Sequence, residues 1–245
     1  MIGKLSGAKR RFGFSRDGLR EPASGWLLTD QIAVPSRIHI IRKNLALTAG
    51  SLNIDVPDSN FEFPIATFPE HVAEAEAIIQ TIRTDRFVIL NPAGGWVTKL
   101  WHAEKFGALA DRIWEEHGMA SVIVTGPKEA DLAEKAAVNS RSGKLTLAEP
   151  SLKGFYELAK RATVYVGGDT GPTHIAVAAG APVVGIFGPT EWWRNGSTVA
   201  EDICVERLGI GCRVDCHRRI CSNWICMDIT VETVFQAVQK RLGNA

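Results

Sequence analysis

The stretch that decides the fold is Tyr165–Thr190, "YVGGDTGPTHIAVAAGAPVVGIFGPT". It holds two apolar runs separated by a segment of small residues, and each run ends in a polar turn that contains glycine. A continuous apolar run is typical of a strand buried on both faces of a parallel sheet. Similar strand and helix patterns alternate from about residue 84 to 190. We therefore predict an α/β domain with a Rossmann-like parallel sheet and right-handed crossovers.

Ligands of an open parallel sheet bind beyond the carboxyl ends of its strands. In the turn after Gly168, Pro172 is placed at the start of a helix, where its missing N–H costs nothing. The unpaired N–H groups and the dipole of that helix start favour an anion such as a diphosphate. Four turns carry groups that suit a phosphorylated ligand: 91–98, 126–129, 168–173 and 188–195.

The side chains of these turns have a functional and a purely structural interpretation. The hydroxyls of Thr170 and Thr173 can donate hydrogen bonds to a ligand, and His174 can contact a phosphate or a sugar hydroxyl. Asp169 or Thr170 can equally be only a helix cap, and His174 a packing residue. Lys99 can act as a point charge for phosphate, or can be an ordinary solvated lysine.

Composition excludes several classes of protein. Of the 245 residues, 45% are hydrophobic and 22% charged, with a formal net charge of +1, so no basic field suggests nucleic-acid binding. The apolar runs are too short to span a bilayer, and the N-terminus lacks the apolar core of a secretory signal. We expect a cytoplasmic protein. Peripheral contact with the inner membrane stays open beside a solvated loop, because basic residues cluster near the N-terminus at Lys9, Arg10, Arg11, Arg16 and Arg20.

Residues 1–83 have a different texture. One plausible strand and two plausible helices do not close an α/β sheet, so we expect a partial N-terminal α/β domain at 1–83 and the main domain at 84–245. The chain ends in a predicted helix with Thr230 as its N-cap, which we expect to pack across toward the N-terminal part.

Several blocks of the sequence together resemble the ADP-heptose:lipopolysaccharide heptosyltransferases, glycosyltransferase family nine. The resemblance rests on the Asp-Thr-Gly-x-x-His signature within 166–190, the strand–turn–Lys-x-Trp–helix block at 90–113, and the Gly-x-x-Glu helix opening within 122–137. The cysteine-rich tail is also similar to that of many members. The resemblance implies a GT-B architecture. It also implies transfer of heptose from ADP-heptose or another nucleotide sugar to a glycolipid acceptor of the lipopolysaccharide core, with inversion and no metal at the reacting centre.

The resemblance also assigns roles to donor-binding residues. It implies that Asp169, Thr170, Gly171 and His174 hold the diphosphate and sugar, that Lys99 reaches a phosphate, and that Glu129 binds the adenosine part. Some members have hydroxyl residues where this chain has Gly94 and Gly95, so only backbone N–H groups serve there. We expect removal of Lys99 to slow transfer far more than it weakens the structure.

The chain departs from the family at its start. Members begin with a further strand and a Gly-Asp turn ahead of a segment like residues 8–21, so we expect a chain that is N-terminally truncated relative to the family. The acidic residue that the resemblance implies as general base has no counterpart, and no catalytic residue is assigned. Asp17, Glu21 and Asp30 are substitutes by chemistry only. Three interpretations remain: an active transferase, a non-catalytic or truncated nucleotide-sugar-binding fragment, and a nucleotide-binding interaction module stabilised by metal.

Four cysteines fall within the stretch 212–226, with His217 among them. Four thiolates can close a tetrahedral zinc site, although the spacing is not that of a zinc ribbon. Disulfides are disfavoured in a cytosolic protein. A structural zinc site and ordinary or disulfide-forming cysteines therefore both stay open for Cys212, Cys216, Cys221 and Cys226, while Cys204 is predicted to be a strand residue.

Overall fold

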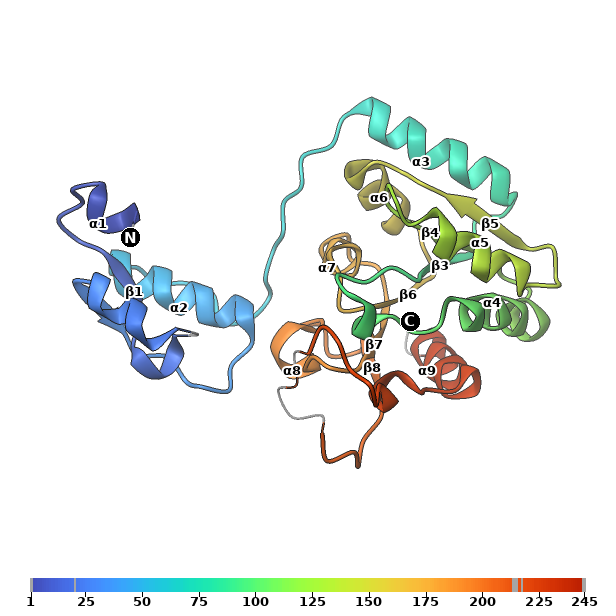
Figure 1. Ribbon diagram of the computed structural model, residues 1–245. Coiled ribbons are helices and arrows are strands. Elements are labelled where there is room, and N and C mark those ends of the chain that lie inside the picture. The colour runs from blue at the N-terminus through green and yellow to red at the C-terminus, as the bar shows by residue number, and fades with distance from the viewer. Residues whose placement is uncertain (1, 20, 213–215, 217, 244–245) are drawn as a thin grey trace. The chain divides into compact units, whose positions relative to one another are not determined.

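The computed structural model describes residues 2–19, 21–212, 216 and 218–243. The chain forms two compact units, Met1–Glu62 with Trp193–Asn195, and Phe63–Trp192 with Gly196–Ala245 (Figure 1). The predicted division at residue 83 therefore moves to Glu62–Phe63. The reason is helix α3 (Pro69–Ile82), which belongs to the second unit because it packs on α6 (Leu152–Ala159).

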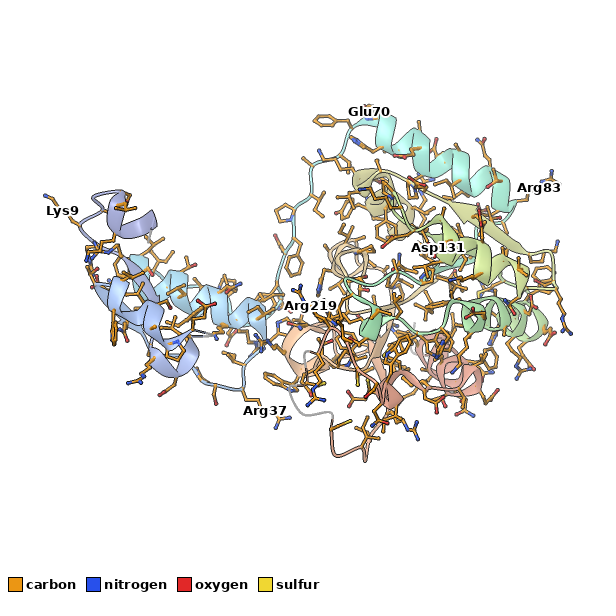
Figure 2. The ribbon with its side chains drawn as sticks, viewed as in Figure 1. Lys9, Arg37, Glu70, Arg83, Asp131 and Arg219 are labelled. Atoms are coloured by element: carbon orange, nitrogen blue, oxygen red, sulfur yellow. The ribbon has the colours of Figure 1, made fainter. Side chains whose placement is uncertain are left out.

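The contact between α3 and α6 is close and partly polar. Gly154 allows it, because a Cβ at this position would lie 1.9 Å from Glu74 Oε2. The same carboxylate accepts hydrogen bonds from the backbone N–H and the hydroxyl of Ser151, at 2.7 and 2.6 Å. In Figure 2, Glu70 and Arg83 mark the two ends of this helix. The spacing of polar and apolar residues in α3 predicts a helix, but it does not show which sheet this helix covers.

The second unit is a six-stranded parallel sheet covered by helices on both faces (Figure 1). Its strands are β3 (Phe87–Asn91), β4 (Ala120–Val124), β5 (Leu145–Ala148), β6 (Val164–Gly168), β7 (Val183–Phe187) and β8 (Ile203–Glu206). Its further helices are η3 (Val97–Lys99), α4 (Ala103–His117), α5 (Ala130–Val138), α7 (Gly171–Ala178), η4 (Ile225–Met227) and α9 (Val231–Gly243). Helix α8 (Trp192–Asn195) holds Trp192 of this unit and three residues of the first.

The strand order β5-β4-β3-β6-β7-β8 places β3 at the centre, where Leu90 pairs with Ile123 on one side and Val166 on the other. Side chains of β3 alternate between two cores: Val88 and Leu90 join the cluster of α4, α5 and α9, and Phe87 joins that of α3, α6 and α7. Chain order reverses between β3 and β6, and this switch point is where such sheets bind ligands. The predicted Rossmann-like α/β fold is confirmed.

The last helix belongs to the core of this sheet. Phe235 and Val238 of α9 are buried in the cluster that α4 shares with β6, β7 and β8. The hydroxyl of Thr230 accepts a hydrogen bond from the Thr233 N–H at 3.1 Å, which is the predicted N-cap. Within the second unit, α9 is thus fixed by its contacts with the sheet and α4. The expected packing toward the N-terminal part stays a prediction.

The first unit contains little regular structure. Its elements are α1 (Ile2–Leu5), β1 (Phe12–Phe14), η1 (Arg16–Gly18), η2 (Pro22–Leu27), β2 (Asp30–Ile32) and α2 (Ile40–Leu52). Strands β1 and β2 pair in parallel, with Phe12 opposite Asp30. Within the described part of residues 1–62, Gly25 alone is buried, and Trp26 is 91% exposed. A two-stranded sheet with so little buried surface is marginal by itself.

Candidate functional site

A pocket of about 390 Å³ opens at the carboxyl ends of β3, β4 and β6, around the switch point of the sheet. This volume is within the range of small-ligand sites. Three of the four predicted turns contribute to it. The fourth, 188–195, lines no part of it, and its Thr190 is buried. The pocket is lined by Ala93, Gly94, Gly95, Lys99, Glu129, Asp169, Thr170, Gly171, Pro172 and His174, so all eight predicted donor-binding residues face one space.

Helix α7 begins at this pocket. Strand β6 ends at Gly168, and Thr170 is the extended N-cap residue, with φ −141°. Pro172 in the first turn contributes no N–H, and the N–H of Gly171 points out of the helix start, where it favours an anion. The helix start therefore offers backbone donors and a partial positive charge to a ligand in the pocket.

Thr173 does not supply the hydroxyl that the sequence suggested. Its side chain is 1% exposed, and it donates a hydrogen bond to the Gly168 carbonyl. The buried Tyr165 hydroxyl lies 3.0 Å from Thr173 Oγ1, and Thr170 Oγ1 lies 3.3 Å from Thr173 Oγ1. This hydroxyl thus fixes the turn between β6 and α7 from beneath. The Thr170 side chain is the threonine that lines the pocket.

Lys99 and Asp169 form a buried ion pair at the wall of the pocket. Lys99 Nζ lies 2.6 Å from Asp169 Oδ2 and also donates to the Asp169 carbonyl at 3.1 Å. The two side chains are 9% and 6% exposed. Breaking such a pair leaves an uncompensated buried charge. Lys99 is therefore structural as well as ligand-facing, and its removal should also destabilise the fold. That transfer falls far more than stability stays a prediction.

The ionisation of Asp169 is set by opposing effects. Burial would raise the pKa of this carboxyl, but the neighbouring His174 and the hydrogen bond and charge of Lys99 together hold the pKa well below its usual range. His174 is half exposed, and its Nε2 lies 3.7 Å from Asp169 Oδ1. A carboxylate with so low a pKa is a poor proton acceptor near neutrality. Asp169 is suited to holding Lys99 and His174 in place.

Glu129 ends the turn after β4 and precedes α5. Its Oε2 accepts a hydrogen bond from the Gly126 N–H at 2.9 Å, which orients the carboxylate at the rim of the pocket. Lys128 before it has φ +77°, a left-handed conformation that costs a non-glycine residue energy and often marks functional turns. A fixed carboxylate at this position can accept hydrogen bonds from vicinal hydroxyls such as those of a ribose.

The two glycines after β3 differ in the space around them. A Cβ on Gly94 would lie 2.8 Å from Leu100 Cδ2, whereas a Cβ on Gly95 would meet nothing within 4 Å. Backbone N–H groups are therefore what this turn offers to a ligand, and Gly95 leaves room above it. A Cβ at the first position would force the end of the Leu100 side chain to shift, whereas glycine at the second leaves open space in the pocket.

The sequence interpretation missed Trp96. Its ring lies 3.9 Å from Lys99 Nζ and thus forms a second anchor for the ammonium, beside Asp169. Its indole Nε1 is buried without a hydrogen-bond partner. The sequence does show an aromatic residue three positions before the lysine. The contact between the Trp96 ring and Lys99, however, depends on how the 3-10 turn η3 folds.

The four tail cysteines line one small cavity, whereas Cys204 lies on β8 as predicted. None of the four forms a disulfide. In the described part of the chain, no three His, Cys, Asp or Glu side chains are grouped so that they could hold a metal ion as they stand. His217 of the same stretch lies outside the described residues.

The candidate base residues lie in the first unit. Asp30 Oδ1 accepts a hydrogen bond from Arg10 Nη2 at 2.8 Å, and the hydrogen bonds from Arg10 and then Thr29 lower the pKa of Asp30. That makes it a weaker base. Asp17 and Glu21 are exposed. No residue is thereby assigned as general base.

The parallel sheet and the pocket at its switch point define a Rossmann-like α/β protein, and solved GT-B structures of glycosyltransferases share this fold over part of their chains. A family 9 glycosyl transferase from Veillonella parvula matches with a TM-score of 0.76 at 19% identity, over 97% of this chain and 68% of that one. The E. coli ADP-heptose lps heptosyltransferase II matches with a TM-score of 0.71 at 16% identity, over 98% of this chain and 72% of that one.

The sequence comparison gives the family. The profile described as "Glycosyltransferase family 9 (heptosyltransferase)" matches residues 1–222, and the chain belongs to this family. Lipopolysaccharide heptosyltransferase 3 of Escherichia coli is 30% identical over 122 residues, which are 45% of this chain and 34% of that protein. Lipopolysaccharide heptosyltransferase 1 of Pseudomonas aeruginosa is 25% identical over 178 residues, 73% of this chain and 48% of that protein. The matches thus span half or less of these curated relatives.

None of the helices in the described residues is both long and apolar enough to cross a bilayer.

Proposed function

We propose that the chain transfers a heptose from ADP-heptose to an acceptor of the lipopolysaccharide core, with inversion at the sugar carbon. The observation that carries the proposal is the convergence of Lys99, Glu129 and Asp169 with the start of α7 on one pocket. These groups come from turns after three different strands of a family 9 chain. E. coli heptosyltransferase WaaC, whose structure with ADP shares this fold at 19% identity, is a relative that binds this nucleotide.

The pocket suits the two ends of the donor differently. The N–H groups at the start of α7 and the Lys99 ammonium would contact the diphosphate, and Glu129 would accept hydrogen bonds from the ribose. When the sugar–oxygen bond breaks, negative charge grows on the diphosphate. Preformed donors aimed at such charge contribute about 3–4 kcal/mol of transition-state stabilisation each. Asp169 and His174 would orient the sugar, and no metal at the reacting centre is invoked.

The first unit favours a second candidate, a nucleotide-sugar-binding fragment that does not catalyse transfer. Only Gly25 is buried among its described residues. Inverting transfer needs a base for the acceptor hydroxyl, and none is assigned. Donor binding by the second unit and transfer to an acceptor are thus separable properties, and the proposed function requires both.

Transfer is tested by incubating the chain with ADP-heptose and a core acceptor that lacks heptose. We expect release of one ADP for each heptose that mass spectrometry finds on the acceptor, and loss of both in Glu129→Gln at low donor concentration. Binding of ADP-heptose without any gain of acceptor mass would refute transfer and support the fragment. Absence of binding would refute both.

The proposal includes peripheral contact with a membrane, because a glycolipid acceptor would be held there. It is motivated by the basic residues of the first unit near Lys9, labelled in Figure 2. Sedimentation with vesicles of anionic lipid, compared with neutral vesicles, measures it directly.

A further inference from the structure

Four cysteine side chains surround a single cavity beside the loop that follows β8. The cavity measures about 20 Å³, enough for one water-sized sphere but too small for an organic ligand. We name it the four-cysteine cavity. It is lined by Thr98, Pro189, Cys212, Cys216, Arg218, Cys221, Trp224, Ile225 and Cys226.

The backbone around Cys221 is arranged to stabilise a charged sulfur. The Trp224 N–H donates to Cys221 Sγ at 3.4 Å, and Trp224 itself adopts a positive φ of 23°. A backbone N–H that donates to a cysteine sulfur favours the thiolate, which is the form that binds a metal. Arg218, which also lines the cavity, offsets part of the charge that several thiolates would bring together.

The same loop is tied to the turn that carries Lys99. Trp224 Nε1 donates to the Thr98 carbonyl at 3.0 Å, and the Thr98 hydroxyl donates to the Arg218 carbonyl. Arg219, labelled in Figure 2, lies with its guanidinium carbon 5.4 Å from the centre of the Trp96 ring. The wall of the four-cysteine cavity therefore includes Thr98, the residue directly before Lys99.

We propose that the four-cysteine cavity binds one divalent, thiol-seeking cation, Zn²⁺ or Fe²⁺, and that this cation holds the Lys99 turn in position. The position of the turn matters for the donor only if the proposed function is right, whereas cation binding is independent of it. Four sulfur ligands in a space for a single ion suit a tetrahedral centre of these metals.

The described side chains are not yet gathered at ligand positions, as noted above. Binding must therefore draw the sulfurs together, and it must release protons from the thiols. Two consequences follow: the cation should protect the loop from proteolysis, and affinity for the cation should rise with pH.

The test measures the metal content of the whole chain, with a matched cysteine variant outside the cavity as the control. Protein produced with zinc and iron in the medium is compared with Cys221→Ser, Cys226→Ser and Cys204→Ser, the last being a half-buried cysteine outside the cavity. Elemental analysis should find one metal ion per chain in the parent and in Cys204→Ser, and less than about a tenth of that in the other two, because each loses a ligand.

Titration of the parent chain with Co²⁺ after chelation provides a readout that does not depend on variants folding. Thiolate-to-cobalt charge-transfer bands should saturate at one equivalent. Their absence, or no metal in the parent, or equal metal loss in Cys204→Ser, would overturn the site. A disulfide among the four cysteines in the parent would overturn it as well.

The link to the donor pocket has its own outcome. Calorimetry should show that the affinity for ADP falls about tenfold or more after the metal is removed. The reason is that a shifted Lys99 turn no longer places its groups correctly for the ligand. Metal at one equivalent with unchanged ADP affinity would overturn the link. A chain that binds the metal but no nucleotide would leave the site standing and refute the proposed function instead.

Discussion

Replacing Lys99 by methionine removes the ammonium while keeping most of the side-chain stem. The change leaves the Asp169 carboxylate, 6% exposed, without its cation. Removing one partner of a buried pair costs about 3–5 kcal/mol. For a chain of this size each kcal/mol lowers the melting temperature by roughly 2–4 °C, so we expect a loss of about 6–20 °C.

The same substitution should weaken ADP binding. A hydrogen bond to a charged group contributes about 1.5–3 kcal/mol, so affinity should fall by a factor of about 10–150. Denaturation by urea measures the first effect, and titration calorimetry, well below the melting temperature of the variant, measures the second.

A double-mutant cycle separates the two effects. Asp169→Asn removes the buried charge, so adding it to Lys99→Met should restore part of the lost stability without restoring ADP affinity. If Lys99→Met cost less than about 1 kcal/mol and bound ADP as well as the parent, the buried pair would have neither of the roles given to it.

The other predictions concern the rim of the pocket and pH. Gly95→Ser should tighten ADP binding by about 0.5–1.5 kcal/mol, since a Cβ there meets nothing within 4 Å and adds a hydroxyl donor. Gly94→Ser is its control and should bring no gain in ADP affinity and a small loss of stability, because the end of the Leu100 side chain must shift, and calorimetry and melting curves that rank the two alike would refute this view of the turn. Glu129→Gln should weaken ADP about tenfold but leave inorganic diphosphate binding unchanged, because the carboxylate is assigned to the ribose. Competition titrations decide it, and equal losses for both ligands would place Glu129 elsewhere. The folded pKa of Asp169 lies below its ordinary value of 3.8, so its stabilising contribution is complete above that pH and is lost as pH falls toward the folded value. The difference in free energy of unfolding between the parent and Asp169→Asn should therefore stay constant from about pH 5 to 8 and shrink in stronger acid, and a decline within that range would contradict the lowered pKa.

Much of the fold could be predicted because its signals are local. Strands β6 and β7 are buried apolar runs, and Thr230 is a cap that the sequence displays directly. The division of the chain could not be placed in this way. Helix α3 is assigned to the second unit by contacts such as that of Glu74 with Ser151, which are far apart in sequence.

The site shows the same limit. The switch point of a parallel sheet gathers the turns after its strands, so their convergence follows from topology. The pairing of Lys99 with Asp169 joins residues 70 positions apart, and it turns a lysine that could have been solvated into a buried one. The Thr173 hydroxyl looked available from its place in the motif, but the buried Tyr165 beneath it decides its partner.

The central claim is that these turns together bind an adenosine diphosphate group. Calorimetric titration of the chain with ADP and with UDP under identical conditions tests it most directly. We predict that ADP binds in preference to UDP, and that His174→Ala and Asp169→Ala each weaken ADP. Equal affinity for the two nucleotides, or ADP binding that both substitutions leave unchanged, would contradict the account.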